Sequence, residues 1–374
     1  MRRALWLAGT LLVSSGAVAA VTLEEAFDLH RRGRLEEALE AYRRVIEARP
    51  GEAELAAARN AACAALNDLG RFAEALAECE RAEALRRDLG AGPELADTLN
   101  NRALSLDALG RPDEAEAAYE EALAIYRERG TAEDQAFVLS NLASLAIGRG
   151  DFGTALERLD EAERLALAAA EEPWAEEELR VARINRAVTL ERLGAYREAL
   201  DALRAAPPGA GSGVEEAALR AITVAVLYRN LGDPWRALAR LDEAEQLLGG
   251  HSDPSIEATI ELNRGLVAQL GLRDPARARG SYERALDRAR ASGDRKEEGR
   301  VLVALGSVEL ELGDPESAAS SFRLALATGE ETGSAEARWT ALGGLARSAL
   351  AAGDEARAEQ LYSEAISTLE TAGA

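Results

Sequence analysis

The sequence is poor in aromatic residues and has no segment typical of a β-strand. Only 4% of its 374 residues are Phe, Trp or Tyr, although 47% are hydrophobic. Ala and Leu therefore fill most apolar positions, a composition that favours helices packed through small side chains. Runs that alternate Val, Ile, Thr and aromatic residues are absent. We expect an all-α fold without a β domain.

Residues that commonly carry catalysis or bind metals are also scarce. The two histidines, His30 and His251, lie far apart in the sequence without other candidate ligands near them. No Gly-x-Ser-x-Gly motif is present. The Gly-rich run at 209–213 lacks the preceding strand and the Lys-Ser/Thr pair of a phosphate-binding loop. We predict that the chain is not an enzyme and needs no metal or cofactor.

Positive charge is outnumbered by negative charge. The sequence has 44 Lys and Arg residues against 66 Asp and Glu residues, a formal net charge of -22. Such a surface repels phosphate backbones and anionic membranes. We therefore expect protein or peptide partners that are basic or neutral, and no nucleic acid.

The first twenty residues differ from the rest of the chain. Arg2 and Arg3 precede an apolar run, and small residues follow as far as Ala20. That order is typical of a secretory signal peptide, here at 1–20. We expect export to the periplasm or the medium, with no membrane insertion of the mature chain. An uncleaved membrane anchor is the alternative, because 4–21 is about long enough to span a bilayer when tilted.

The two cysteines, Cys63 and Cys79, fall in one stretch that reads as a helical hairpin. They could form a disulfide in an oxidising compartment, provided that their Cα atoms lie within about 7 Å of each other. They could equally be small buried thiols, because related stretches have small or apolar residues at both positions. Both alternatives stay open.

A repeat of about forty residues dominates the sequence. Eight glycines are each followed, five positions later, by an alanine. Together with Ala278 of a ninth copy, successive alanines lie 37 to 44 residues apart. The eight pairs are Gly33 and Ala38, Gly70 and Ala75, Gly110 and Ala115, Gly150 and Ala155, Gly194 and Ala199, Gly232 and Ala237, Gly313 and Ala318, and Gly353 and Ala358. A ninth copy has Gly271 before Ala278, which indicates a two-residue insertion in the turn. Such a period predicts stacked helical hairpins.

The conserved spacing has a physical explanation in each hairpin. The glycine can end the first helix in the left-handed conformation. Asp-Pro pairs such as Asp233-Pro234 then start the second helix. Small residues about seven positions before the turn, such as Ala103 and Gly265, let the helices approach. Larger residues four positions after the alanine are predicted to form the core: Tyr42, Cys79, Tyr119, Leu159, Leu203, Leu241, Tyr282, Phe322 and Tyr362.

These motifs resemble those of tetratricopeptide repeats. Leu305-Gly306 followed by Ala318 and Phe322 matches the family pattern, and the resemblance covers about residues 22–372. It implies a right-handed α-solenoid of about nine helical hairpins. The long period is similar to that of kinesin light chains, of spindle-orientation adaptors and of the arrays that precede bacterial caspase-like (CHAT) domains.

One interruption divides the array. We expect repeats 1–5 over 21–208, a flexible joint at 209–213 next to Pro207-Pro208, and repeats 6–9 over 214–374. No extra polar helix follows the last repeat. We therefore expect its apolar stripe to be covered by a partner, a further domain or a second copy, the last giving a homodimer through the C-terminal helix.

Asparagines recur about nine positions before the turn glycine, at Asn101, Asn141, Asn185 and, across the insertion, Asn263. The resemblance implies that first helices line a concave face, where long-period relatives hold a peptide backbone with such a ladder. An Asn side chain suits this role because it offers both a donor and an acceptor. Hydrogen bonding between neighbouring helices is the alternative.

Two further sets of residues lie beside the asparagine ladder. Arg102, Arg186 and Arg264 each follow an asparagine and could pair with acidic groups of a partner or with residues of this chain. Apolar residues, most of them in pairs four positions apart, form a stripe on one helical face. If the stripe faces the concave groove, it is a hydrophobic docking strip. If it does not, it belongs to the core. The stripe consists of Ile184, Val188, Ile222, Val226, Leu262, Leu266 and Val303.

The sequence thus predicts an exported, bacterial-type interaction scaffold that binds a peptide or protein segment on its concave face, across repeats three to seven. One alternative is a sensor or scaffold module of a caspase-like peptidase system whose catalytic domain is absent from this chain. Another is a self-assembling envelope protein.

Overall fold

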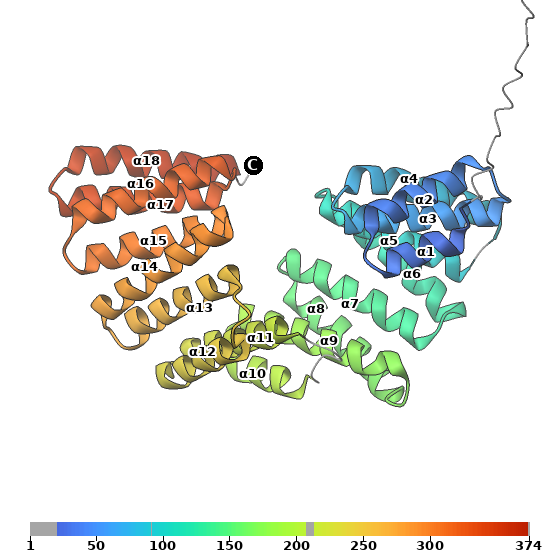
Figure 1. Ribbon diagram of the computed structural model, residues 1–374, viewed down its shortest axis with the longest axis horizontal. Coiled ribbons are helices and arrows are strands. Elements are labelled where there is room, and N and C mark those ends of the chain that lie inside the picture. The colour runs from blue at the N-terminus through green and yellow to red at the C-terminus, as the bar shows by residue number, and fades with distance from the viewer. Residues whose placement is uncertain (1–20, 91, 207–212, 373–374) are drawn as a thin grey trace, which may run out of the picture. The chain divides into compact units, whose positions relative to one another are not determined.

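A computed structural model describes residues 21–90, 92–206 and 213–372. The described residues form eighteen α-helices, one π-helix and no strand, which confirms the predicted all-α fold (Figure 1). Helices follow one another as antiparallel pairs. We name the odd-numbered member of each pair the first helix and the even-numbered member the second helix.

Contacts divide the chain into two compact units, residues 1–178 and 179–374, which are described separately. The first unit holds α1 (Leu23–Arg31), α2 (Leu35–Glu47), α3 (Glu52–Asp68), α4 (Phe72–Asp88), α5 (Pro93–Ala108), α6 (Pro112–Arg129), α7 (Ala132–Gly148) and α8 (Phe152–Ala168). Helix α9 (Pro173–Arg192) begins in the first unit and ends in the second.

The second unit continues with α10 (Tyr196–Ala205), α11 (Val214–Asn230), α12 (Pro234–Leu248), α13 (Pro254–Leu266), the π-helix (Val267–Gly271), α14 (Pro275–Ser292), α15 (Arg295–Glu311), α16 (Pro315–Glu331), α17 (Ala335–Ala351) and α18 (Glu355–Ala372). The predicted signal peptide and all of the predicted joint except Gly213 lie outside the described residues. Both remain predictions. None of the described helices is long and apolar enough to cross a membrane.

The hairpin turns form as the spacing predicts. All eight turn glycines are left-handed, with φ between 71° and 83°. Asp233, Asp274 and Asp314 each cap the helix that follows, and a proline occupies the first turn of that helix. At the other end of the array, Thr22 and Glu25 form a reciprocal capping box at the start of α1.

The insertion near Gly271 lies in the first helix and not in the turn, so the expected two-residue turn insertion is wrong. Arg273 takes the left-handed position, with φ of 54°, and Ala278 keeps its normal spacing from this turn residue. The π-helix just before it accommodates the additional residue, because each π-type turn holds more residues than an α-type turn.

The predicted core stripe is buried in every repeat but the last. Eight of its nine residues are at most 3% exposed, whereas Tyr362 of α18 is 38% exposed. In the second unit the small residue of the first helix faces this large residue directly. A Cβ atom added to Gly265 would lie 2.2 Å from Cε1 of Tyr282. Glycine therefore sets how closely α13 approaches α14.

Cys63 of α3 and Cys79 of α4 are joined as a disulfide, with an S–S distance of 2.09 Å and a Cα–Cα distance of 5.4 Å. Both side chains are fully buried. The bond links the two helices of the second hairpin across 16 residues of sequence.

Candidate functional site

The first helices of neighbouring repeats lie side by side and form one continuous face in each unit. Helix α3 contacts α1 and α5 in the first unit, and α13 contacts α11 and α15 in the second. Second helices pack chiefly against the first helices of their own and the next repeat. Residues spaced one repeat apart on first helices can therefore act on the same ligand.

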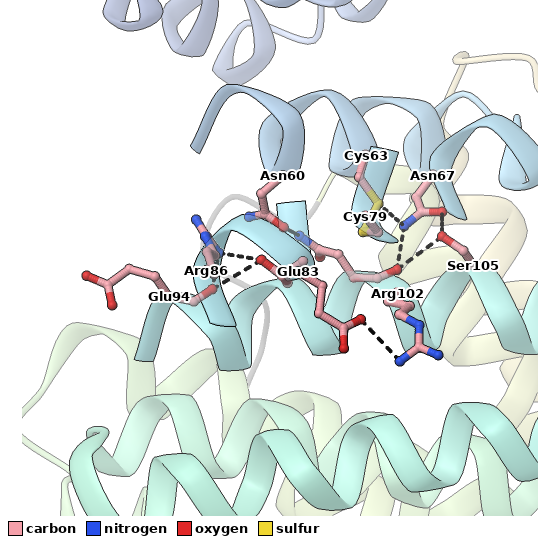
Figure 2. Close-up of a disulfide and its surroundings, with 11 residues drawn as sticks. Asn60, Cys63, Asn67, Cys79, Glu83, Arg86, Glu94, Arg102 and Ser105 are labelled. Carbon is pink, nitrogen blue, oxygen red and sulfur yellow. Dashed lines mark hydrogen bonds and ion pairs between the residues drawn. A yellow bond between two sulfur atoms is a disulfide. The ribbon is translucent and has the colours of Figure 1, made fainter. Parts of the chain in front are cut away.

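Two of the predicted asparagines join first helices to each other. The side-chain amide of Asn101 donates to Oδ1 of Asn60 at 3.1 Å, and that of Asn141 donates to Oδ1 of Asn100 at 2.8 Å. Figure 2 shows Asn60 and, about two turns further along α3, Asn67. The side-chain amide of Asn67 donates to the backbone oxygen of Asn101 at 2.9 Å. These bonds use one N–H of each predicted asparagine and leave its second N–H and its oxygen for other partners.

The asparagines of the second unit are placed differently. Asn263 is 7% exposed. It donates to the backbone oxygen of Thr259 at 2.9 Å and accepts from Arg229 at 3.1 Å. Asn185 is half-buried and also has a partner within the chain. The ladder predicted from the sequence is thus a set of helix-to-helix bonds in the first unit and a buried polar contact at Asn263.

The predicted arginines pair within the chain. Arg102 forms an ion pair with Glu83 at 3.2 Å. Figure 2 shows this pair. Arg264 forms ion pairs with Asp242, Glu245 and Glu261 at 2.7 to 2.8 Å. Arg186 is likewise engaged within the chain. A partner would have to compete with these acidic groups.

A cavity of about 620 Å³ opens on the first-helix face of the first unit, and we name it the acidic hollow. Its carboxylates are Asp97, Glu133, Asp134, Glu177 and Glu178. Its other lining residues are Asn60, Asn100, Asn101, Tyr126, Phe137 and Trp174. Four successive first helices, α3, α5, α7 and α9, supply all of these residues except Tyr126, which comes from α6.

Two carboxyl groups of the acidic hollow have raised pKa values, although only Glu178 is buried and Asp97 is exposed. Burial raises the pKa of Glu178, which is 9% exposed and accepts a hydrogen bond from the hydroxyl of Ser140. Desolvation within the hollow also raises the pKa of Asp97, even though the hydroxyl of Tyr126 donates to it. A cation placed beside either carboxyl would favour its ionised form and so lower its pKa.

A second cavity, of about 650 Å³, lies on the first-helix face of the second unit, between α13, α15 and α17. Its apolar lining consists of Leu262, Leu266, Leu270, Val303, Ala304 and Ala337, and we name it the apolar groove. Leu270 projects from the π-helix and is 64% exposed. The sequence insertion thus places an exposed leucine at the groove.

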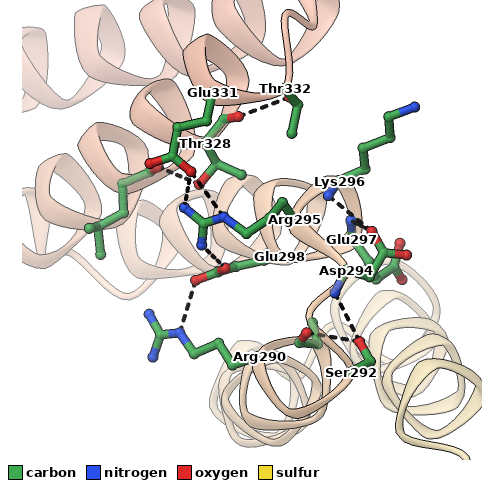
Figure 3. Close-up of polar contacts among 12 residues, drawn as sticks. Arg290, Ser292, Asp294, Arg295, Lys296, Glu297, Glu298, Thr328, Glu331 and Thr332 are labelled. Carbon is green, nitrogen blue, oxygen red and sulfur yellow. Dashed lines mark hydrogen bonds and ion pairs between the residues drawn. The ribbon is translucent and has the colours of Figure 1, made fainter. Parts of the chain in front are cut away.

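One edge of the apolar groove is formed by the start of α15, which Figure 3 shows in detail. Glu298 is buried there and pairs with Arg290, at 2.9 Å, and with Arg295. Arg295 also pairs with Glu331 of α16. Glu297 is buried as well and pairs with Arg300 at 2.7 Å. Each buried carboxylate at this edge therefore has an arginine partner.

The predicted apolar stripe is divided between core and groove. Ile222 is buried in the core of the second unit, and Ile184 packs against that core. Val188 and Val226 are half-buried. Leu262 and Leu266 line the apolar groove together with Val303. Among the predicted polar residues, Asn101 lines the acidic hollow.

Sequence reasoning missed Asp97, Phe137 and Trp174. Their spacing to the predicted asparagines could have identified two of them. Asp97 lies four positions before Asn101, and Phe137 lies four positions before Asn141, so each shares a helical face with its asparagine. Trp174 stands four positions before Glu178 in the same way. None of these residue types recurs at its position through the array, so the repeat pattern did not select them.

Nine helical hairpins with ligand-sized cavities on the first-helix face define an α-solenoid of the protein-interaction class. One family model, described as tetratricopeptide repeat, matches residues 54–128, 94–168 and 256–331, and another of the same description matches 303–372. The chain belongs to the tetratricopeptide repeat family. A model for anaphase-promoting complex subunit 5 matches residues 146–210. No curated protein sequence matches the chain.

Solved structures share this fold at low sequence identity. The apo form of RapI is 11% identical, with a TM-score of 0.68, and the match covers 94% of this chain and 97% of RapI. The apo quorum sensor NprR from B. thuringiensis is 14% identical, with a TM-score of 0.64 and coverage of 82% and 86%. A signal-transduction ATPase with a tetratricopeptide repeat sensor, from Pyrococcus horikoshii, is 14% identical, with a TM-score of 0.58 and coverage of 93% and 53%.

Proposed function

We propose that the chain is a scaffold that binds an extended segment of a partner protein in the apolar groove of its second unit. The observation that carries this proposal is the groove itself, an open cavity of about 650 Å³ on the first-helix face. A volume of this size is within the range of pockets that bind ligands. It would accept a few consecutive residues of a peptide.

The chemistry of the groove suits an extended apolar segment. Leu266, Leu270 and Val303 offer surface that is partly open to solvent, and covering it would be favourable. Ser307 and Thr340 add hydroxyl groups that can bond to a peptide backbone. Because α13, α15 and α17 all contribute, the bound segment would cross three repeats.

Two of the similar structures support a binding role by their descriptions, one as a quorum sensor and one as containing a tetratricopeptide repeat sensor. We also propose that the chain is exported. The order of charged, apolar and small residues at 1–20 supports export, and so does the Cys63–Cys79 disulfide, because such bonds persist in oxidising compartments. Binding requires no catalytic group.

Selection of peptides from a random display library tests the proposed function. Selected peptides are synthesised, and their affinity is measured by fluorescence anisotropy. We expect Leu270→Glu to weaken binding by about tenfold or more, because it places a charge against the apolar segment. Leu324→Glu is the matched control, since Leu324 is 52% exposed but lies on α16, a second helix, outside the groove. Equal affinity of both variants, or no enrichment of any peptide, would contradict the proposal.

A further inference from the structure

The residues that line the acidic hollow of the first unit carry negative charges that no positively charged lining residue balances. Five carboxylates line it, and none of its lining residues is Arg, Lys or His. Like charges gathered in one concave site repel each other and focus a negative potential. A site of this kind attracts a cation from outside the chain.

Buried carboxylates of the second unit provide an internal comparison. Glu297 and Glu298 are each 6% exposed, and each pairs with arginine. Glu178 is 9% exposed, yet among the described residues its hydrogen-bond partner is a neutral hydroxyl, that of Ser140. A buried carboxylate without a positive partner costs free energy. Glu178 therefore lacks the arginine partner that Glu297 and Glu298 have. Of the other carboxylates, Glu177 is engaged within the chain, and Asp97 is close enough to the buried Arg86 for that charge to lower its pKa.

Aromatic rings lie among these carboxylates. Phe137 is 51% exposed, although it is large and apolar. Trp174 packs against the core of the first unit with part of its surface and lines the hollow. Ring faces attract cations, and a planar guanidinium both stacks on a ring and bonds to carboxylates through its fork of N–H groups. Rings and carboxylates together favour an organic cation.

The size of the hollow also favours an organic cation over a metal ion. Its volume of about 620 Å³ is far larger than a metal ion needs. Within the part of the chain that the structure describes, no three His, Cys, Asp or Glu residues are grouped closely enough to coordinate one metal. On one wall, Asn60, Asn100 and Asn101 present side-chain amides, groups that can bond to a peptide backbone.

We propose that the acidic hollow binds the side chain of an arginine from a partner polypeptide. The guanidinium lies against Phe137 and Trp174 and bonds to Glu178 and Asp97. The amides beside it hold the adjoining backbone. This site is separate from the apolar groove of the second unit, so failure of either proposal leaves the other standing.

Fluorine NMR of the full chain labelled with 5-fluorotryptophan tests this site. The probe is a blocked pentapeptide, acetyl-Gly-Ala-Arg-Ala-Gly-amide. We expect it to shift the resonance of Trp174, assigned with a Trp174→Phe variant, in a saturable way. Trp235 and Trp339, which belong to the second unit and lie outside the hollow, serve as internal controls and should not move.

The competing ligands are the citrulline and lysine versions of the peptide, ethylguanidinium and calcium chloride. We expect citrulline, which is neutral, to bind at least about tenfold more weakly, and lysine more weakly than arginine. Ethylguanidinium should bind more weakly than the peptide, because it has no backbone. Equal binding of citrulline or lysine, equal binding of ethylguanidinium, or a Trp174 shift with calcium alone would each overturn the proposal.

Paired variants separate the role of the hollow from general effects on folding. Phe137→Ala should weaken binding of the arginine peptide by about fivefold or more. Leu167→Ala, at an equally exposed position on α8, should leave that affinity unchanged. Glu133→Gln should also weaken it, unlike Glu52→Gln in the first turn of α3. All four positions are exposed, so the variants should fold, and circular dichroism checks this. Unchanged affinity of both Phe137→Ala and Glu133→Gln would overturn the proposal.

Discussion

The two units are built from the same hairpin but use its first-helix face in different ways. In the first unit, Asn101 and Asn141 bond to neighbouring first helices, and a cavity rich in carboxylates opens beside Asn101. In the second unit, Asn263 is buried against Arg229, and the cavity combines six apolar side chains with charged residues that include Arg295, Lys296 and Arg300. The residues that pack the hairpins are common to both units. Repeat positions that face solvent were therefore free to acquire different binding chemistry.

Stabilisation also differs between the units. The first unit has a disulfide between α3 and α4, whereas the second unit relies on close packing of glycine against aromatic rings, as at Gly265 and Tyr282. In repeat arrays each hairpin contacts mainly its neighbours, so such devices act locally. A substitution in one unit should therefore alter the unfolding of that unit more than the unfolding of the other.

Removal of the disulfide should have the largest effect, and it should be confined to the first unit. The bond closes a loop of 16 residues, and we expect the Cys63→Ala, Cys79→Ala double variant to lose about 3 kcal/mol of unfolding free energy. Urea unfolding followed through fluorinated Trp174 reports on the first unit, and Trp235 and Trp339 report on the second. Only the Trp174 transition should move.

Reduction of the unmodified chain with dithiothreitol is the control and should shift the same transition by a similar amount. An equal shift of the Trp174, Trp235 and Trp339 signals would show that the units unfold together, and the local comparison would then fail.

The second prediction concerns glycine packing in the second unit. Gly265→Ala should destabilise the chain by about 1 to 3 kcal/mol, because its Cβ would overlap the ring of Tyr282. Gly343→Ala, in the middle of α17, is the matched control, since no atom lies within 4 Å of the added Cβ. This variant should gain about 0.5 to 1 kcal/mol from helix propensity. Thermal unfolding of both variants checks the contrast, and similar losses would refute it.

The fold was predictable because its packing residues recur. Each turn needs a left-handed residue and each helix pair needs a small residue at the crossing, so Gly110, Ala115 and their counterparts are found by spacing alone. The π-helix was not predictable in this way. Counting from Gly271 cannot show whether an inserted residue enters the turn or the preceding helix, and the difference depends on how α13 packs.

Only part of the candidate site was predictable, for a related reason. Asn101, Leu262 and Leu266 line the two cavities and belong to recurring patterns. Phe137 and Trp174 do not recur, and only the stacking of successive first helices brings them to the same cavity. The pairing of Arg264 with three carboxylates was also hidden, because two of those acids come from α12.

The smallest expected effect concerns Glu178, the buried carboxylate of the acidic hollow that is bonded to the hydroxyl of Ser140. Burial raises the pKa of Glu178 in the folded chain above its ordinary value of 4.5. The ionised group therefore destabilises the fold above the raised pKa, and this cost disappears below pH about 4.5, where the carboxyl is protonated in both states. Glu178→Gln should raise the Tm by about 2 °C at pH 7 and have no effect at low pH.

Glu298→Gln in the second unit is the comparison, because Glu298 is as deeply buried but pairs with Arg290 and Arg295. That variant should lower the Tm at pH 7, since it removes both ion pairs. A saturating concentration of the arginine peptide should reduce the Tm difference between Glu178→Gln and the unmodified chain. Only the Glu178 carboxylate gains a positive partner from the ligand. Differential scanning fluorimetry from pH 4 to pH 8 measures all three effects. A loss of stability in Glu178→Gln at pH 7 would mean that this carboxylate already has a stabilising partner within the chain.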